Sequence, residues 1–140
     1  MYTIVFLDAA TVDFGDIDLK PLSQAGKLIT YSITKPEEVI ERSKTADIII
    51  TNKVVFTKKE IECLEHCKLI AVAATGYNTI DIEAAHKKGI AVANVPGYSR
   101  ESVAELTMCF ILSLAPNLIN YNEATHDGSW SNSPIFTMGK

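Results

Sequence analysis

The chain has 140 residues, of which 47% are hydrophobic and 21% are charged, and its formal net charge is −4. This composition is typical of one globular domain, and an acidic chain with scattered Lys and Arg argues against a nucleic-acid partner. The longest apolar run, 106–116, is about half a membrane-spanning helix in length, so no membrane partner is expected.

Five short runs rich in β-branched residues predict strands, and they cover 3–7, 28–33, 47–51, 69–73 and 90–93. Two of these runs are continuously apolar, which predicts strands buried on both faces of a parallel sheet. Helical segments alternate with the strands, and right-handed crossovers join parallel strands. The pattern therefore predicts an α/β fold, with a five-stranded parallel flavodoxin-like sheet and flanking helices.

Local signals mark where the helices between these strands begin and end. Two capping boxes, Thr34–Glu37 and Thr57–Glu60, predict helix starts, and Asp81 is a further N-cap. Gly89 is interpreted as the left-handed stop of the helix that Asp81 begins, and Gly26 as the stop of an earlier helix.

The segment 99–127 differs from the rest because it predicts one long apolar interdomain helix. Either Ser99 or the capping box Ser102–Glu105 begins it, Pro116 is expected to kink it, and Gly128 to end it. A helix that is apolar nearly all round is typically buried on every side in a larger protein. The predicted organisation is a flavodoxin-like domain over 1–98, this helix over 99–127, and a linker over 128–140.

Ligands of an open parallel sheet bind beyond the carboxyl ends of its strands. Gly76 follows a buried strand directly, so its loop could turn successive amide hydrogens outward and hold a carboxylate. Lys53 or Asn52, after the preceding strand, would complete the hydrogen bonds of that guest. Plainer interpretations stay open: Gly76 as a simple turn, Lys53 as a solvated lysine, and Tyr98 as a cover for the sheet edge.

The remaining reactive side chains form no convincing catalytic or metal-binding set. Cys63 and Cys67 lie one helical turn apart with His66 between them, but no second ligand cluster exists, so no metal site is predicted. An odd number of cysteines without a framework fits a reducing cytoplasm. Asp8 ends the first strand, where a phosphoacceptor or metal-binding carboxylate could lie, but Asn52-Lys53 stands where a receiver domain would have an Asp.

Three segments, Ile70–Asp81, Gly89–Ser99 and Ser102–Glu105, have a combined spacing that is highly specific. They resemble the D-isomer-specific 2-hydroxyacid dehydrogenases, and Thr51–Val54 and Asn94–Tyr98 favour the glycerate dehydrogenase (hydroxypyruvate reductase) branch. The resemblance implies a flavodoxin-like substrate domain and an inserted Rossmann domain that binds NAD(H).

The resemblance also implies roles for individual residues. The loop at Thr75 and Gly76 matches the family segment whose backbone amides hold the substrate carboxylate. Asn52, Lys53 and Tyr98 match further substrate-binding positions.

On the cofactor side, Thr75, Val103 and Thr107 match positions near the nicotinamide. The family's G-x-G-x-x-G loop and its catalytic Arg, Glu and His are expected beyond residue 140. No catalytic residue is therefore assigned, and the Rossmann cofactor domain is expected to be absent from the chain. NAD is expected to serve the intact enzyme and not to bind this chain tightly.

The favoured hypothesis is that the chain is the substrate-domain portion of an NAD-dependent oxidoreductase. The intact enzyme is expected to be a cytoplasmic homodimer that acts on a small D-2-hydroxy or 2-oxo acid, namely D-glycerate or hydroxypyruvate. The 140-residue chain alone is expected to be inactive. One alternative is a non-catalytic dimerisation or regulatory module that uses the exposed apolar helix. A flavodoxin-like flavin-binding domain is a weaker alternative, because no Ser/Thr-rich phosphate loop follows the first strand.

Overall fold

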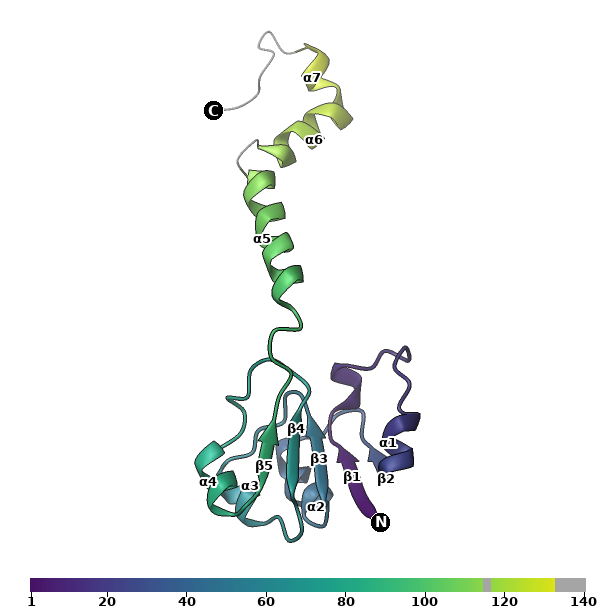
Figure 1. Cartoon of the computed structure of the whole chain (residues 1–140). Coiled ribbons are helices and arrows are strands. Elements are labelled where there is room, and N and C mark those ends of the chain that lie inside the picture. The colour runs from purple at the N-terminus through teal and green to yellow at the C-terminus, as the bar shows by residue number, and fades with distance from the viewer. Residues whose placement is uncertain (115–116, 133–140) are drawn as a thin grey trace. The chain divides into compact units, whose positions relative to one another are not determined.

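The computed structural model describes residues 1–114 and 117–132. Its five strands are β1 (Tyr2–Phe6), β2 (Gly26–Thr30), β3 (Ile48–Thr51), β4 (Leu69–Val72) and β5 (Ala91–Ala93). They form one parallel sheet in the order β2-β1-β3-β4-β5 (Figure 1). The predicted five-stranded parallel flavodoxin-like architecture is confirmed.

Short helices connect the strands, and longer ones follow β5. The helices are η1 (Ala9–Thr11), α1 (Lys20–Ala25), η2 (Pro36–Glu38), α2 (Val39–Ser43), α3 (Lys58–Glu62), α4 (Ile82–Lys87), α5 (Arg100–Leu114), α6 (Leu118–Asp127) and α7 (Ser129–Asn132). The chain divides into two compact units, one from Met1 to Gly97 and a second that begins at Tyr98. No described helix is by itself long and apolar enough to cross a membrane, although α5 and α6 counted together reach that length and apolar content.

The hydrophobic core lies against one face of the sheet. Residues from α2, α3 and α4 share a single cluster with alternate residues of β3 and β4. The crossover from β1 to β2 runs in the opposite direction across the sheet, so a right-handed connection places α1 on the other face. The alternate residues Ile48, Ile50 and Leu69 lie outside the core cluster and stay partly exposed, because α1 packs against β2 at the edge of the sheet and not against β3 or β4. The prediction that these strands are buried on both faces is wrong for the described residues.

Most of the predicted helix signals act as expected. Thr57 N donates to Glu60 Oε2 at 2.9 Å and Lys59 N donates to Thr57 Oγ1 at 3.3 Å, which confirms this capping box. The hydrogen bond from the Thr57 side chain holds the pKa of Glu60 below its ordinary value. Ala84 N donates to Asp81 Oδ1 at 2.9 Å, and Gly89 has the left-handed φ of 72° that ends α4.

The capping box predicted at Thr34–Glu37 is wrong by one residue. Lys35 N donates to Glu38 Oε2 at 2.9 Å, so Glu38 takes the role that the sequence pattern gave to Glu37. The Thr34 hydroxyl is bound elsewhere, since it donates to the Leu7 carbonyl and accepts from Arg42 Nη1. A tertiary contact therefore displaces the local cap.

Gly26 does not end α1 in a left-handed conformation, which corrects its predicted role. Its φ of −178° is extended, and it is the first residue of β2, paired with Tyr2 of β1. A Cβ at this position would lie 2.4 Å from the carbonyl oxygen of Tyr2. Glycine is thus required by the close approach of two backbones and not by its own dihedral angles.

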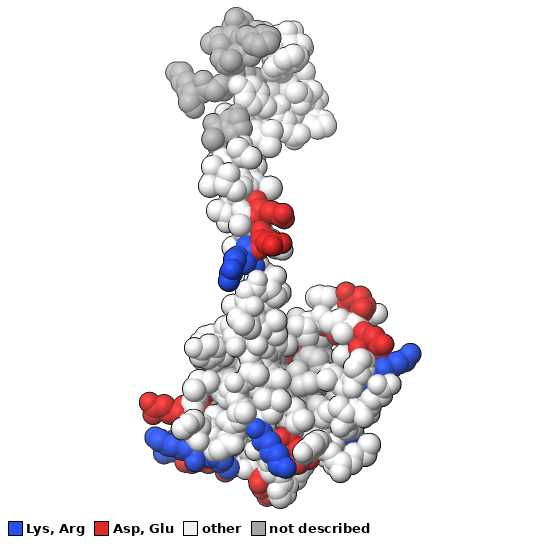
Figure 2. All heavy atoms as spheres, viewed as in Figure 1, with Lys and Arg blue, Asp and Glu red and all other residues white. Residues whose placement is uncertain are grey.

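The second unit begins with α5, which buries none of its residues. Figure 2 shows charged side chains at the start of this helix and an uncharged surface along the rest of its visible face. Its exposed apolar side chains are Val103, Leu106, Met108, Phe110, Ile111, Leu112 and Leu114. Val103 N donates to the Ser99 carbonyl at 2.9 Å, so the helix starts from Ser99 and Ser102 lies inside it. Gly128, at φ 75°, ends α6 as predicted, and Pro116 lies outside the described residues.

Candidate functional site

Two polar loops at the carboxyl edge of the sheet are tied together by one aromatic residue. Phe56, in the loop after β3, is completely buried and forms a parallel bridge with Ile80, in the loop after β4. Phe56 N donates to the Thr79 carbonyl at 2.8 Å, and Asp81 N donates to the Phe56 carbonyl at 2.9 Å. The two loops that carry the predicted acid site in this unit are therefore fixed relative to each other.

The loop after β4 is held from its other side by the loop after β5. Val95 N donates to the Ala74 carbonyl at 3.0 Å, and Asn94 Nδ2 donates to the Thr75 carbonyl at 2.7 Å. The Thr75 hydroxyl donates to the Val95 carbonyl at 3.3 Å. These bonds use the carbonyl oxygens and the Thr75 side chain, and none of them uses an amide hydrogen of the loop after β4.

The amide hydrogens from Thr75 to Asn78 donate to no group in the part of the chain that the structure describes. All four residues are exposed, so these donors are available to a ligand. Gly76 does not adopt a left-handed φ, and a Cβ there would meet only Asn78 Oδ1, at 3.2 Å. Its dihedral angles therefore do not require glycine, but the lack of a side chain keeps the amides open to close approach.

The loop after β3 is organised around Asp8, which follows β1 and is 2% exposed. Asn52 N donates to both carboxylate oxygens of Asp8 at 3.0 Å, and Lys53 N donates to Oδ2 at 2.6 Å. β1 and β3 are neighbours in the sheet although they are not consecutive in sequence. This carboxylate thus lies at the topological switch point, where such sheets place their ligands.

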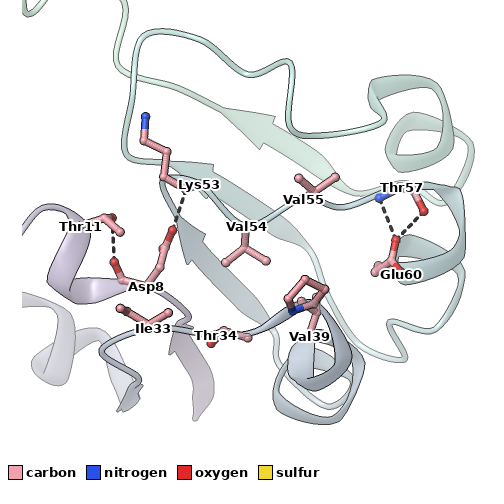
Figure 3. Close-up of a pocket in the computed structure, with 11 residues that line it drawn as sticks. Asp8, Thr11, Ile33, Thr34, Val39, Lys53, Val54, Val55, Thr57 and Glu60 are labelled. Carbon is pink, nitrogen blue, oxygen red and sulfur yellow. Dashed lines mark hydrogen bonds between the residues drawn. The ribbon is translucent and has the colours of Figure 1, made fainter.

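The side chains of Asn52 and Lys53 are available to different degrees. Asn52 Nδ2 donates to Thr11 Oγ1 at 3.1 Å, which leaves the Asn52 side-chain oxygen as its open group. The Lys53 side chain is exposed and points away from Asp8 (Figure 3). No ion pair or hydrogen bond holds its ammonium within the described residues. Lys53 is therefore a free positive charge beside the carboxyl edge of the sheet.

A cavity of about 370 Å³ opens on the other side of this loop, between the β3–α3 loop and the segment that precedes α2 (Figure 3). It is lined by Asp8, Thr11, Ile33, Thr34, Pro36, Val39, Lys53, Val54, Val55, Thr57 and Glu60. Most of the lining surface is apolar, and Asp8, Thr34 and Glu60 are already bound within the protein. The cavity offers shape and apolar contact, and Lys53, which also lines it, adds a free positive charge. The free amides lie on the loop after β4.

The structure brings four of the predicted site residues, Asn52, Lys53, Thr75 and Gly76, to the strand ends of the first unit. Tyr98, Val103 and Thr107 belong to the second unit, and Tyr98 and Val103 are 67% and 60% exposed. Thr107 Oγ1 donates to the Val103 carbonyl at 2.7 Å, so its hydroxyl hydrogen is occupied inside the helix.

The sequence identified Asp8 only as a carboxylate at a strand end and did not reveal its role in this site. A single Asp after a strand has many possible roles. Its bonds to Asn52 and Lys53, which lie 44 and 45 positions later in the sequence, depend on the sheet order. The flavodoxin-like order was the one available signal, since it places the first and third strands side by side.

Among the described residues, no three His, Cys, Asp or Glu side chains converge as metal ligands would. Burial raises the pKa of the Cys67 thiol to about 11, so this thiol stays protonated at neutral pH.

Comparison with known proteins adds the family to this geometry. The family model of the D-isomer specific 2-hydroxyacid dehydrogenase catalytic domain matches residues 4–137. The chain belongs to the D-isomer-specific 2-hydroxyacid dehydrogenase family. It is 37% identical to a hydroxypyruvate reductase of Blautia hydrogenotrophica over 94% of this chain and 42% of that protein. The chain thus spans less than half the length of this dehydrogenase.

The chain is also similar in fold to solved structures. An acyclic imino acid reductase in complex with NADPH and D-Arg matches with a TM-score of 0.79 at 23% identity, over 90% of this chain and 41% of that protein. That similarity shows the fold. An NAD⁺-bound 3-phosphoglycerate dehydrogenase of Entamoeba histolytica matches with a TM-score of 0.66 at 30% identity, over 80% of this chain and 38% of that protein. The matches cover the substrate-domain part of 2-hydroxyacid dehydrogenases, and one sheet contains all the strands of the described residues.

Proposed function

We propose that this chain is the substrate-binding part of an NAD-dependent oxidoreductase that acts on D-2-hydroxy acids, with D-glycerate and hydroxypyruvate as its pair of acids. The observation that carries the proposal is the run of free, exposed amides from Thr75 to Asn78 at the carboxyl edge of β4. Successive backbone amides of this kind bind small anions without a cationic side chain. Family membership and the similarity to a hydroxypyruvate reductase support the choice of acid.

The amides of Thr75 and Gly76 hold the acid's carboxylate, and the free ammonium of Lys53 adds a charge-assisted hydrogen bond. The Asn52 side-chain oxygen remains open and accepts from a hydroxyl of the acid. The family resemblance adds Tyr98 as a further residue proposed for the acid.

NAD, when bound, supplies the hydride acceptor for the hydroxy acid. Thr75, Val103 and Thr107 are the residues of this chain assigned to contact the nicotinamide side. The Thr75 and Thr107 hydroxyl hydrogens are both bound to backbone carbonyls, so each hydroxyl presents an acceptor oxygen to a ligand. No proton-transfer group is assigned within the chain.

Titrating the ¹⁵N-labelled 140-residue chain with hydroxypyruvate or D-glycerate tests the acid site directly. We expect saturable chemical-shift changes centred on the amides of residues 75–78, with a millimolar dissociation constant, because a small acid makes few contacts. Lys53→Met should weaken this binding about tenfold, since it removes one charge-assisted hydrogen bond. The change keeps the length and apolar stem of the side chain.

Lys27→Met is the matched control, because Lys27 is an exposed lysine on the edge strand β2 with no ion pair among the described residues. It changes the net charge equally and should leave the dissociation constant unchanged. Shift changes that spread over the surface without saturation, or equal effects of the two lysine substitutions, would contradict the proposed site.

A second candidate, a dimerisation module, is favoured by the bare apolar surface of α5. Phe110 is 60% exposed and Leu114 is 72% exposed. Large contiguous apolar surfaces of this kind mark interaction sites. Light scattering on the chain tests this candidate, for which we expect twice the monomer mass and a return to the monomer mass in Phe110→Glu. A monomer at all concentrations would remove this candidate and leave the acid-binding proposal intact.

A further inference from the structure

Asp8 is a buried carboxylate whose hydrogen bonds come from the last residue of β3 and from the loop that carries Lys53. It is 2% exposed, and none of the ion pairs among the described residues includes it. Burying a charged carboxylate is costly unless hydrogen bonds compensate for the lost water. The compensating donors are the amides of Asn52 and Lys53 and the hydroxyl of Thr51, at 2.6 to 3.3 Å.

Thr51 extends this network by one residue. Its hydroxyl donates to Asp8 Oδ2 at 3.3 Å and accepts from Val54 N at 3.1 Å. The three consecutive amides of residues 52–54 are therefore held by two buried side chains. The backbone from which Lys53 extends is determined by these bonds and not by a helix or a strand.

The way in which Asp8 holds the loop leaves the charge of Lys53 free. A direct ion pair between the two side chains would occupy the ammonium that the acid needs. Asp8 instead binds the Lys53 backbone amide, and the Lys53 ammonium points away from it (Figure 3). We propose that Asp8 is a positioning residue, which fixes the Asn52-Lys53 backbone so that the Lys53 ammonium is presented to the acid. This inference rests on the proposed function, in which Lys53 contacts the substrate.

Asp8→Asn tests the proposal, because asparagine keeps the shape but replaces one acceptor oxygen with a donor that faces amide hydrogens. We expect hydrogen exchange at the Asn52 and Lys53 amides to accelerate about tenfold or more, and the affinity for hydroxypyruvate to fall about tenfold. Asp47→Asn is the matched control. Asp47 Oδ2 accepts from Thr3 N at 2.8 Å, immediately before β3, so it makes the same kind of bond at the opposite end of that strand.

A double-mutant cycle separates positioning from a general loss of structure. If Asp8 acts mainly through Lys53, Asp8→Asn should weaken binding much less in the Lys53→Met background than in the unsubstituted chain, and the residual loss reflects Asn52, which Asp8 also holds. Additive losses in the double mutant would overturn the proposal, and so would unchanged exchange at residues 52 and 53.

Failure of the proposed function gives a different result. If the unsubstituted chain binds neither acid, the acid site is refuted, while the amide exchange rates still decide whether Asp8 fixes the loop. Should Asp8→Asn fail to fold, Thr51→Val provides the second test, because it keeps the shape of a completely buried side chain and removes its hydroxyl. It should accelerate exchange at residues 52–54 and weaken binding of the acid, and unchanged values of both would overturn the proposal.

Discussion

Replacing Phe56 by alanine is expected to lower the free energy of unfolding of the first unit by about 3–5 kcal/mol, as truncation of a buried phenylalanine usually does. Phe56 is completely buried and belongs to the single core cluster. A domain of this size has a total stability of about 5–15 kcal/mol, so the variant loses a large share of it. Thermal unfolding followed by circular dichroism measures the effect, and the midpoint should fall by about 15 °C or more.

Phe14→Ala is the control for this experiment, because Phe14 is 87% exposed and its truncation should change stability by less than about 0.5 kcal/mol. Equal effects of the two substitutions would show that the core is not built as described. Alanine keeps the main-chain bonds of Phe56 to Thr79 and Asp81, but it removes the buried ring that anchors this bridge between the loops after β3 and β4 in the core. The variant should therefore bind the acid more weakly at temperatures where it is still folded, as the NMR titration would show.

Gly26→Ala is expected to destabilise the first unit by about 3 kcal/mol, because the added methyl group would lie 2.4 Å from the Tyr2 carbonyl oxygen. The obstacle is backbone and not the end of a flexible side chain, so β1 and β2 must move apart to relieve it. Denaturant unfolding gives the magnitude. Hydrogen exchange should show the loss concentrated in the pairing of β2 with β1.

Gly76→Ala is a suitable comparison, since Gly76 is exposed, has no left-handed φ and would meet only the Asn78 side chain. Its unfolding free energy should stay within about 0.5 kcal/mol of that of the unsubstituted chain, because alanine also restricts the unfolded chain. A Gly26→Ala variant as stable as Gly76→Ala would refute the close contact between β1 and β2.

Local patterns predicted correctly the features that depend on a few neighbouring residues. The Thr57–Glu60 capping box, the Asp81 cap and the left-handed Gly89 each need only residues within one helical turn, and all three are confirmed. The parallel flavodoxin-like sheet is also confirmed, because alternating strands and helices with right-handed crossovers leave few arrangements to choose from.

The errors arose where a distant segment competes for the same group. Thr34 is a good capping residue by pattern, but the Leu7 carbonyl, 27 positions away, takes its hydroxyl. Gly26 matched a helix stop, while its real constraint is the backbone of Tyr2. Asp8 was identified only as a strand-end carboxylate, since its partners become apparent once β1 lies beside β3.

Asp8 holds the loop after β3 through main-chain amide hydrogens, and this determines which substitutions the loop can accept. Every residue type except proline has that hydrogen, so the hold of Asp8 on the loop does not depend on which side chain stands at position 53. The Asn52 side chain differs, because it also donates to Thr11. Substitutions at position 53 can therefore alter the charge or length presented to the acid while the conformation of the loop persists.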